Sequence, residues 1–195
     1  MKKDLNAERL EKMRRVAKAR FPDLRICLYD IKNEHNIAAI IRTCDFFGVQ
    51  NIDIINEKYD KEGMPINALI TKGAHKWMDL KIWRGSAEYV NWARKNGFEI
   101  YLTTLSEDAA DYSKEKYQGR IIVVLGNEKS GIKDELLIEN AAKNVIIMPR
   151  GFSQSLNVSV SAGIILSHIV LKKAGRGNNA EEKDVKKWLK KWIEE

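Results

Sequence analysis

The stretch Arg120-Ile-Ile-Val-Val-Leu-Gly-Asn-Glu-Lys-Ser-Gly131 joins an apolar run to a polar segment bounded by glycines. A short apolar run rich in β-branched residues is typical of a strand buried on both faces, as in a parallel sheet. The polar segment follows the carboxyl end of that strand, which is where open α/β sheets bind their ligands. This stretch therefore indicates a parallel α/β sheet with a site beyond residue 125.

The middle of the chain repeats this alternation of strand and helix signals. Strands are predicted at residues 25–31, 52–56, 80–84, 98–105, 120–125 and 144–148. Helices are predicted at residues 36–48, 86–95, 133–141 and 155–174, with Ser86 capping the second and Gly48, Gly97 and Gly175 at three of the ends. Such alternation implies right-handed crossovers, so we expect an α/β fold with a mostly parallel sheet and helices on both faces.

The two ends of the chain read as amphipathic helices outside this sheet. Asn6 can cap the first, and Pro22 is expected to end it. The second has a stripe of apolar residues that must pack on something, because an isolated helix of this length is marginal. The stripe consists of Val185, Trp188, Leu189, Trp192 and Ile193. We therefore expect an N-terminal helical extension at 1–22, a core at 23–174 and a C-terminal helical extension at 175–195.

The positive charge of the chain lies in these two ends. The net charge is +7, with eight basic and three acidic residues in 1–20 and eight and five in 172–195, which leaves −1 for 21–171. A basic extension on a near-neutral domain is a common footprint of nucleic-acid binding, although a solvated, solubilising helix explains the charge equally well. The candidate RNA contacts are Arg9, Lys12, Arg15, Lys18 and Arg176.

Other features narrow the functional class. No apolar run reaches the roughly 18 residues that a membrane span needs, and the amino-terminal sequence lacks the apolar core of a secretory signal, so we expect a cytoplasmic protein. Cys27 and Cys44 lie in apolar contexts that suit buried thiols. The three histidines are far apart and there is no Cys-x-x-Cys pair, so we expect no metal site.

Three polar segments at strand ends are candidates for the chemistry, and the first is Asn33-Glu-His-Asn36 with Arg42. Asn36 is expected to start a helix, and Arg42, nearly two turns later, to face the same side. Taken alone, a capping asparagine and a surface arginine explain these residues better.

The second and third segments follow the strands at 120–125 and 144–148. Gly126 and Gly131 have P-loop spacing, but Ile132 stands where the lysine is required, which leaves a tight turn with exposed amides and Glu128 at its tip. Residues 148–157 precede a helix rich in small residues. Close packing of that helix on the sheet is the alternative explanation for them.

In this order and at strand ends, the three segments resemble the motifs of the SPOUT superfamily of RNA methyltransferases, in its TrmH branch. The resemblance covers about residues 24–172 and is carried by NIAAIIRTCDFFGV (36–49), VVLGNEKSGI (123–132) and MPRGFSQSLNVSVSAG (148–163). TKGAHKW (71–77) and a helical extension at each end look like the enzymes that methylate the ribose of guanosine 18 in tRNA.

The resemblance implies a C-terminal trefoil knot whose loops hold S-adenosylmethionine. By motif match the cofactor-binding positions are Thr103, Leu125, Gly126, Ile147, Ser155 and Leu156. The matching catalytic positions are Arg42, in the central role, with Asn36, Glu128, Ser155 and Asn157. It also implies a homodimer, for which the helix at 158–170 and the stripe through Trp188 and Trp192 offer apolar surface.

The expected function is S-adenosylmethionine-dependent 2′-O-methylation of a tRNA ribose, at guanosine 18 of the D-loop. Methylation of another RNA, at a ribosomal or a tRNA wobble nucleotide, is the alternative within this branch. A non-catalytic RNA-binding relative is a second alternative. An ordinary Rossmann-type nucleotide enzyme is disfavoured because its G-x-G-x-x-G fingerprint is absent.

Overall fold

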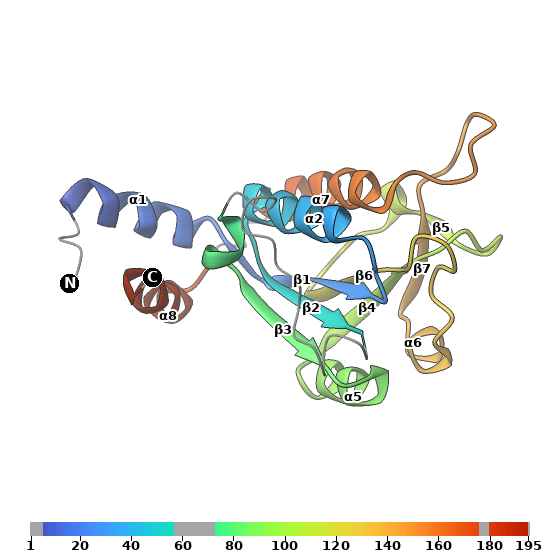
Figure 1. The fold of residues 1–195 in the computed structure, drawn as a ribbon, viewed down its shortest axis with the longest axis horizontal. Coiled ribbons are helices and arrows are strands. Elements are labelled where there is room, and N and C mark those ends of the chain that lie inside the picture. Colours follow the sequence, from blue (N-terminus) through green and yellow to red (C-terminus); the bar gives the residue numbers. More distant parts are fainter. Residues whose placement is uncertain (1–5, 57–72, 176–179, 195) are drawn as a thin grey trace.

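The computed structural model describes residues 6–56, 73–175 and 180–194, so Thr71, Lys72 and Arg176 of the predictions above lie outside the described residues. Seven parallel strands form one sheet in the order β3-β2-β1-β6-β4-β7-β5 (Figure 1). The strands are β1 (Phe21–Tyr29), β2 (Val49–Ile55), β3 (Asp79–Trp83), β4 (Phe98–Thr103), β5 (Ala110–Asp111), β6 (Arg120–Leu125) and β7 (Lys143–Ile146).

Helices cover both faces of the sheet, as the alternating sequence pattern predicts (Figure 1). On one face lie α2 (Glu34–Phe47) and α7 (Val158–Ala174), and on the other α5 (Ser86–Lys95) and α6 (Glu135–Glu139). Along β6, Ile121 and Val123 pack toward the first pair of helices, whereas Ile122 and Val124 pack toward the second. Single 3₁₀ turns occur at η1 (Ala74–Trp77) and η2 (Tyr112–Lys114).

The six predicted strands are all present, and the largest difference is at β1. This strand begins at Phe21, four residues before its predicted start, so Pro22 lies inside it. The expectation that Pro22 ends the first helix is therefore wrong, because α1 (Ala7–Lys18) already ends at Lys18. The pairing of β1 with β2 is irregular between Phe21 and Arg25, where a residue without an amide hydrogen is tolerated. The two-residue β5 was missed, since so short a strand has no alternation to detect.

The starts or caps of the predicted helices also differ from the prediction. The cap of α2 is Asn33, whose side chain accepts a 2.9 Å hydrogen bond from the His35 amide, so Asn36 lies inside the first turn. The helix predicted at 155–174 begins at Val158, after its cap Asn157.

On the other face, Gly85 precedes α5, and the Ser86 hydroxyl donates a hydrogen bond to Asp134 instead of capping its own helix. Asp134 in turn caps α6, which is shorter than the predicted helix at 133–141.

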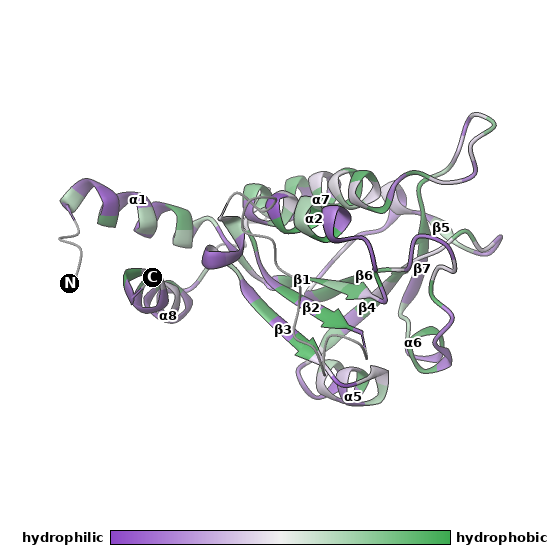
Figure 2. Cartoon of the chain, viewed as in Figure 1, coloured by the Kyte–Doolittle hydropathy of each residue, from purple (hydrophilic) through white to green (hydrophobic). Residues whose placement is uncertain are grey.

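The terminal helices α1 and α8 (Glu182–Glu194) pack against each other at one end of the molecule (Figure 1). Hydrophilic and hydrophobic bands alternate along α1 (Figure 2), and its buried Met13 and Ala17 meet Trp188 and Trp192 of α8. The expectation that the two tryptophans offer surface for a second copy is therefore wrong, because this chain covers them itself. In addition, the Trp192 indole donates a 3.1 Å hydrogen bond to the carbonyl of Trp77.

Candidate functional site

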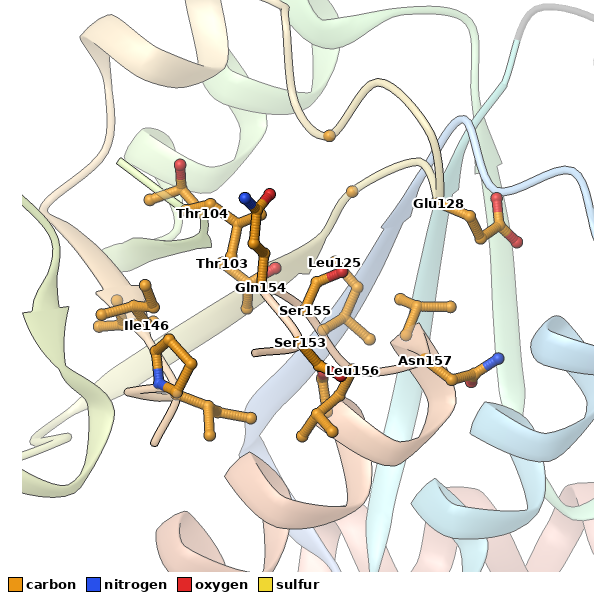
Figure 3. Close-up of a pocket in the computed structure, with 18 of the residues that line it drawn as sticks. Thr103, Thr104, Leu125, Glu128, Ile146, Ser153, Gln154, Ser155, Leu156 and Asn157 are labelled. Atoms are coloured by element: carbon orange, nitrogen blue, oxygen red, sulfur yellow. The ribbon is translucent and has the colours of Figure 1, made fainter. Parts of the chain in front are cut away.

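A cleft opens at the edge of the sheet where the parallel strands end. Its volume is about 1140 Å³, and it is lined by residues 103–106, 125–132 and 145–158 with Ser161 and Ile165. The first three segments follow β4, β6 and β7. Figure 3 shows Glu128 and Asn157 at one end of this cleft and Thr103, Thr104 and Ile146 at the other. The position agrees with the general rule for ligand sites in parallel sheets.

The turn after β6 depends on a glycine at its start. A Cβ atom at Gly126 would lie 2.7 Å from Cγ1 of Ile132 and 2.8 Å from the carbonyl carbon of Gly131, so no side chain fits. The turn closes through the Gly131 amide, which donates a 2.9 Å hydrogen bond to the carbonyl of Asn127. The tight turn expected from the sequence is confirmed, with Glu128 on it. The expectation of exposed amides is wrong for Lys129, Ser130 and Gly131, because these amides donate to Asn127 within the turn.

The three sequence motifs meet in one hydrogen-bonded network. The Asn36 Nδ2 group donates to Oε1 of Glu128 at 2.9 Å, and the Asn157 Nδ2 group donates to Oδ1 of Asn36 at 3.1 Å. The backbone amide of Asn33 also points at Oε1 of Glu128, at 3.4 Å. Asn36 is buried, whereas Glu128 and Asn157 are exposed to the cleft. Asn36 thus joins two residues that a bound molecule can reach.

Hydrogen bonding keeps Glu128 ionised. Partial burial raises the pKa of its carboxyl, but the hydrogen bonds from the Asn36 side chain and from backbone amides of Glu128, Lys32 and Asn33 outweigh this effect. The net pKa of Glu128 therefore lies below its ordinary value. A carboxylate with this environment orients donors and attracts cations.

Arg42 does not share a face of α2 with Asn36, and the prediction that it does is wrong. At 3.6 residues per turn, six residues place two side chains about 120° apart. Arg42 is exposed, does not line the cleft, and makes no hydrogen bond or ion pair with the part of the chain that the structure describes. Its guanidinium is therefore available to an external anion.

All six residues predicted to hold the cofactor line the cleft. Leu125 is buried at its floor, and Leu156 is 48% exposed in the loop before α7. The Thr103 hydroxyl donates a 2.9 Å hydrogen bond to the carbonyl of Val124 and so faces the sheet. Ser155, named in both the cofactor and the catalytic set, is exposed in the same loop (Figure 3). Apolar side chains and loop backbone line the cleft, and a lining of this kind fits a nucleoside-containing cofactor.

Asn127 and Asp30 are not among the site residues predicted from the sequence. Asp30 has a positive φ of 49° and lies between β1 and α2, where the Asn127 side chain contacts it. A Gly-Asn pair at a strand end is a recognisable turn signal. Its partner lies 97 residues away, however, and no local pattern identifies such a contact.

Three further sequence predictions concern the cysteines, metal sites and membrane spans. Cys27 and Cys44 are free and buried, as expected, and burial raises the pKa of both thiols. Among the described residues there is no group of three or more His, Cys, Asp or Glu side chains placed to hold a metal ion. Within the same residues, no helix has both the length and the apolar character to cross a membrane.

Comparison with known proteins agrees with this fold. The model of the SpoU rRNA Methylase family matches residues 23–167. A tRNA (guanosine(18)-2′-O)-methyltransferase of Aquifex aeolicus is 35% identical over 194 residues, covering 96% of this chain and 90% of that protein.

Solved structures give the same result. The A. aeolicus TrmH/SpoU tRNA modifying enzyme superimposes with a TM-score of 0.87 at 34% identity, covering 96% of this chain and 95% of that one. The fold is also that of the SpoU methyltransferase AviRb from Streptomyces viridochromogenes, solved in complex with AdoMet. That comparison has a TM-score of 0.66 at 20% identity and covers 82% of this chain and 64% of that one. With a family match over most of its length and a relative at this level of identity, the chain belongs to the SpoU rRNA methylase family.

Proposed function

We propose that this protein transfers the methyl group of S-adenosylmethionine to the ribose 2′-hydroxyl of guanosine 18 in the D-loop of tRNA. The observation that carries the proposal is the network of Glu128, Asn36 and Asn157 at one end of the cleft. The activity named for the A. aeolicus relative supports the choice of RNA and nucleotide.

The cleft holds the methyl donor in this proposal. S-adenosylmethionine bound in the cleft would supply an electrophilic methyl group. The residues that would hold it are Thr103, Leu125, Gly126, Ile147, Ser155 and Leu156. The proposal involves no metal. The AviRb structure, which has the same fold, contains AdoMet and supports this donor. We also infer that residues 145–158 belong to the trefoil knot of the family.

The residues around the cleft then act on the ribose. A 2′-hydroxyl is a poor nucleophile until its proton leaves, so the protein must orient it and stabilise the developing negative charge. Arg42, exposed and without a partner in the described chain, binds the neighbouring phosphate and stabilises the alkoxide. Because a guanidinium stays charged, Arg42 is a poor proton acceptor. The remaining polar residues of the network and the loop before α7, which are Asn36, Glu128, Ser155 and Asn157, orient the ribose and the cofactor.

A second copy of this chain covers α7 in the proposed homodimer. Two large apolar side chains of α7 are exposed, Leu171 at 73% and Val160 at 49%. Phe46 on the neighbouring α2 is 83% exposed. Since Arg42 lies one turn before Phe46, this interface forms beside the active site. A dimer mass by light scattering at micromolar concentration supports the proposal, and a monomer mass contradicts it.

The remaining elements of the proposal concern RNA binding and location. Four basic side chains of α1 bind the tRNA backbone, and so does Arg176 in the segment after α7. In α1 these are Lys12, Arg15 and Lys18, which are exposed, and Arg9, which is partly exposed. The N-terminal unit of the proposed division, expected at 1–22, ends before β1 begins at Phe21, and the core is followed by a C-terminal unit at 175–195. In this proposal the first and last units serve RNA binding. The enzyme works in the cytoplasm, where its tRNA substrate is found.

The test is methyl transfer to an unmodified tRNA transcript, followed by nuclease mapping of the label. We expect a label at nucleotide 18, and no transfer when that nucleotide is 2′-deoxyguanosine. A label at the wobble nucleotide or in ribosomal RNA would reassign the substrate. Tight tRNA binding without transfer would identify a non-catalytic relative.

A further inference from the structure

Asn127 uses both polar atoms of its side chain to join two parts of the site. Its Nδ2 group donates to the carbonyl oxygen of Asp30 at 2.7 Å and lies 3.3 Å from Oδ2 of the same residue. Its Oδ1 atom accepts from the amides of Lys129 and Ser130 at 2.9 and 3.0 Å. One amide group therefore holds the turn after β6 in shape and attaches it to the bend after β1.

The bend at Asp30 needs such a partner. Asp30 has a φ of 49°, a conformation that Asp tolerates better than most residues, and its own amide donates to the carbonyl of Ile55. The Asp30 carbonyl lies just beyond the β1 ladder in a partly buried position, where a backbone oxygen favours a hydrogen-bond partner. Asn127 supplies that bond.

Glu128, the next residue in the turn, contacts the β1–α2 segment at a second point. Glu128 accepts hydrogen bonds from the amide of Asn33 and the side chain of Asn36, which lie three and six residues beyond Asp30. Asn127 and Glu128 thus hold the β1–α2 segment at two successive points. Without the hydrogen bond from Asn127 to the Asp30 carbonyl, the turn and the Glu128 carboxylate on it would be free to move.

We propose that Asn127 is a positioning residue for methyl transfer, which acts through Glu128 by locking the turn after β6 onto the bend at Asp30. This inference rests on the proposed function only for its kinetic readout. Asn127 also lines the cleft, but all its side-chain hydrogen-bonding atoms are engaged by the protein itself. Its contribution is therefore geometric.

The substitution Asn127→Asp separates this role from simple shaping of the turn. The variant keeps an oxygen for the Lys129 and Ser130 amides but places a second oxygen against the Asp30 carbonyl and carboxylate, where acceptors repel. We expect kcat to fall roughly 100-fold, the loss typical of a displaced catalytic group, with little change in the Kd for S-adenosylmethionine. The variant Asp30→Asn/Asn127→Asp places a donor opposite the new carboxylate and should recover about tenfold.

A matched control makes the same chemical change away from the cleft. Asn96 donates a 2.8 Å hydrogen bond to the carbonyl of Trp92 at the end of α5. Asn96→Asp should lower Tm slightly and leave kcat unchanged. In a Glu128→Ala background, Asn127→Asp should cost little further activity, because residues that act through one another are not additive.

A readout without turnover keeps the inference separate from the proposed function. The side-chain amide signals of Asn36 in NMR spectra should move in Asn127→Asp toward their positions in Glu128→Ala, whether or not the protein methylates tRNA. Unmoved Asn36 signals would overturn the proposal. So would an unchanged kcat in Asn127→Asp, or a full additional loss in the Glu128→Ala background.

Discussion

Two polar networks in this molecule differ in burial, and the difference separates stability from activity. In the interior, Asp53 is fully buried and accepts hydrogen bonds from Arg25, Trp83 and Tyr89. At the cleft, the ionised Glu128 is exposed, and its side-chain donor is the neutral amide of Asn36.

The interior network is built to satisfy a buried charge. Nε and Nη2 of Arg25 bind the two carboxylate oxygens of Asp53 at 2.6 and 2.8 Å, and its guanidinium lies 4.8 Å from the Trp92 ring centre. Burial lowers the pKa of Arg25, but Asp53 more than offsets this and the net pKa is raised. Burial raises the pKa of Tyr89, so its hydroxyl stays protonated and donates to Asp53. No cleft residue is involved, which indicates a structural role.

The largest effect on stability should come from breaking the interior pair. Asp53→Ala leaves the Arg25 charge buried without a partner, and such a loss costs about 3–5 kcal/mol. The measurement is urea unfolding followed by circular dichroism, with methylation assayed well below the transition. We expect unchanged kcat in the folded fraction.

A second variant tests the cause of that loss. Arg25→Met/Asp53→Ala removes the unpaired charge and should be more stable than Asp53→Ala alone. Equal stability of the two variants would show that the charge is not the cause.

The largest effect on activity should come from Arg42→Ala. A preorganised charged group at a developing oxyanion contributes about 10²–10³ in kcat, so turnover should fall by that factor. Binding of S-adenosylmethionine, measured by calorimetry, should stay close to wild type because Arg42 does not line the cleft. Turnover within about tenfold of wild type would exclude Arg42 from the chemistry.

Glu128→Ala and Asn157→Ala should have a smaller effect on activity than Arg42→Ala. Glu128→Ala removes the carboxylate that accepts hydrogen bonds from Asn36 and the Asn33 amide, and a bond to a charged group is worth about 1.5–3 kcal/mol, or roughly tenfold to 100-fold in rate. Asn157→Ala loses its bond to Asn36 and also the cap of α7, which costs about 0.5–2 kcal/mol of stability. Thermal melting should change little in Glu128→Ala and moderately in Asn157→Ala, in both cases less than in Asp53→Ala. A large fall in Tm with normal residual activity would mean that the cleft network is structural after all.

The pH dependence of Glu128 sharpens this contrast. Because its pKa is lowered in the folded protein, its contribution to stability is present above the ordinary value of 4.5 and is lost as pH falls through the lower folded value. The Tm difference between wild type and Glu128→Gln should therefore vanish only at pH values below 4.5. A difference that disappears already near neutral pH would contradict the hydrogen-bonding account.

Local sequence patterns predict the strands, the turns and the motif residues. They do not predict contacts between residues that are far apart in the sequence. The apolar run before Gly126 predicts β6 to the residue, and the motif match places all six cofactor candidates in one cleft. The hydrogen bond from Asn127 to Asp30 and the pairing of Arg25 with Asp53 join residues far apart in sequence, so no periodicity reveals them. The prediction that Arg42 shares a face of α2 with Asn36 is wrong because their separation of six residues is not a whole number of helical turns.

The smallest expected effect is on tRNA binding by α1, whose exposed basic side chains and packed apolar side chains lie on different faces. Met13 and Ala17 face α8, whereas Lys12, Arg15 and Lys18 are exposed, so charge can be reversed without touching the packed face. Each phosphate contact that is lost should reduce the slope of log affinity against log salt by about 0.7–0.9. Reversing Arg9, Lys12, Arg15 and Lys18 should therefore weaken tRNA binding most at low salt and leave the Kd for S-adenosylmethionine unchanged.

The control for this last prediction changes the same charge elsewhere. Lys12→Glu/Arg15→Glu on α1 and Arg94→Glu/Lys95→Glu on α5 alter the net charge equally, and all four side chains are exposed. If binding depends on the position of the charge, only the first variant flattens the salt slope. If it depends on net charge, the two variants weaken binding alike, since long-range attraction does not distinguish the helices. An unchanged affinity and slope in the α1 variant, with its Tm preserved, would make α1 a structural cap on α8 and reassign RNA binding to the core.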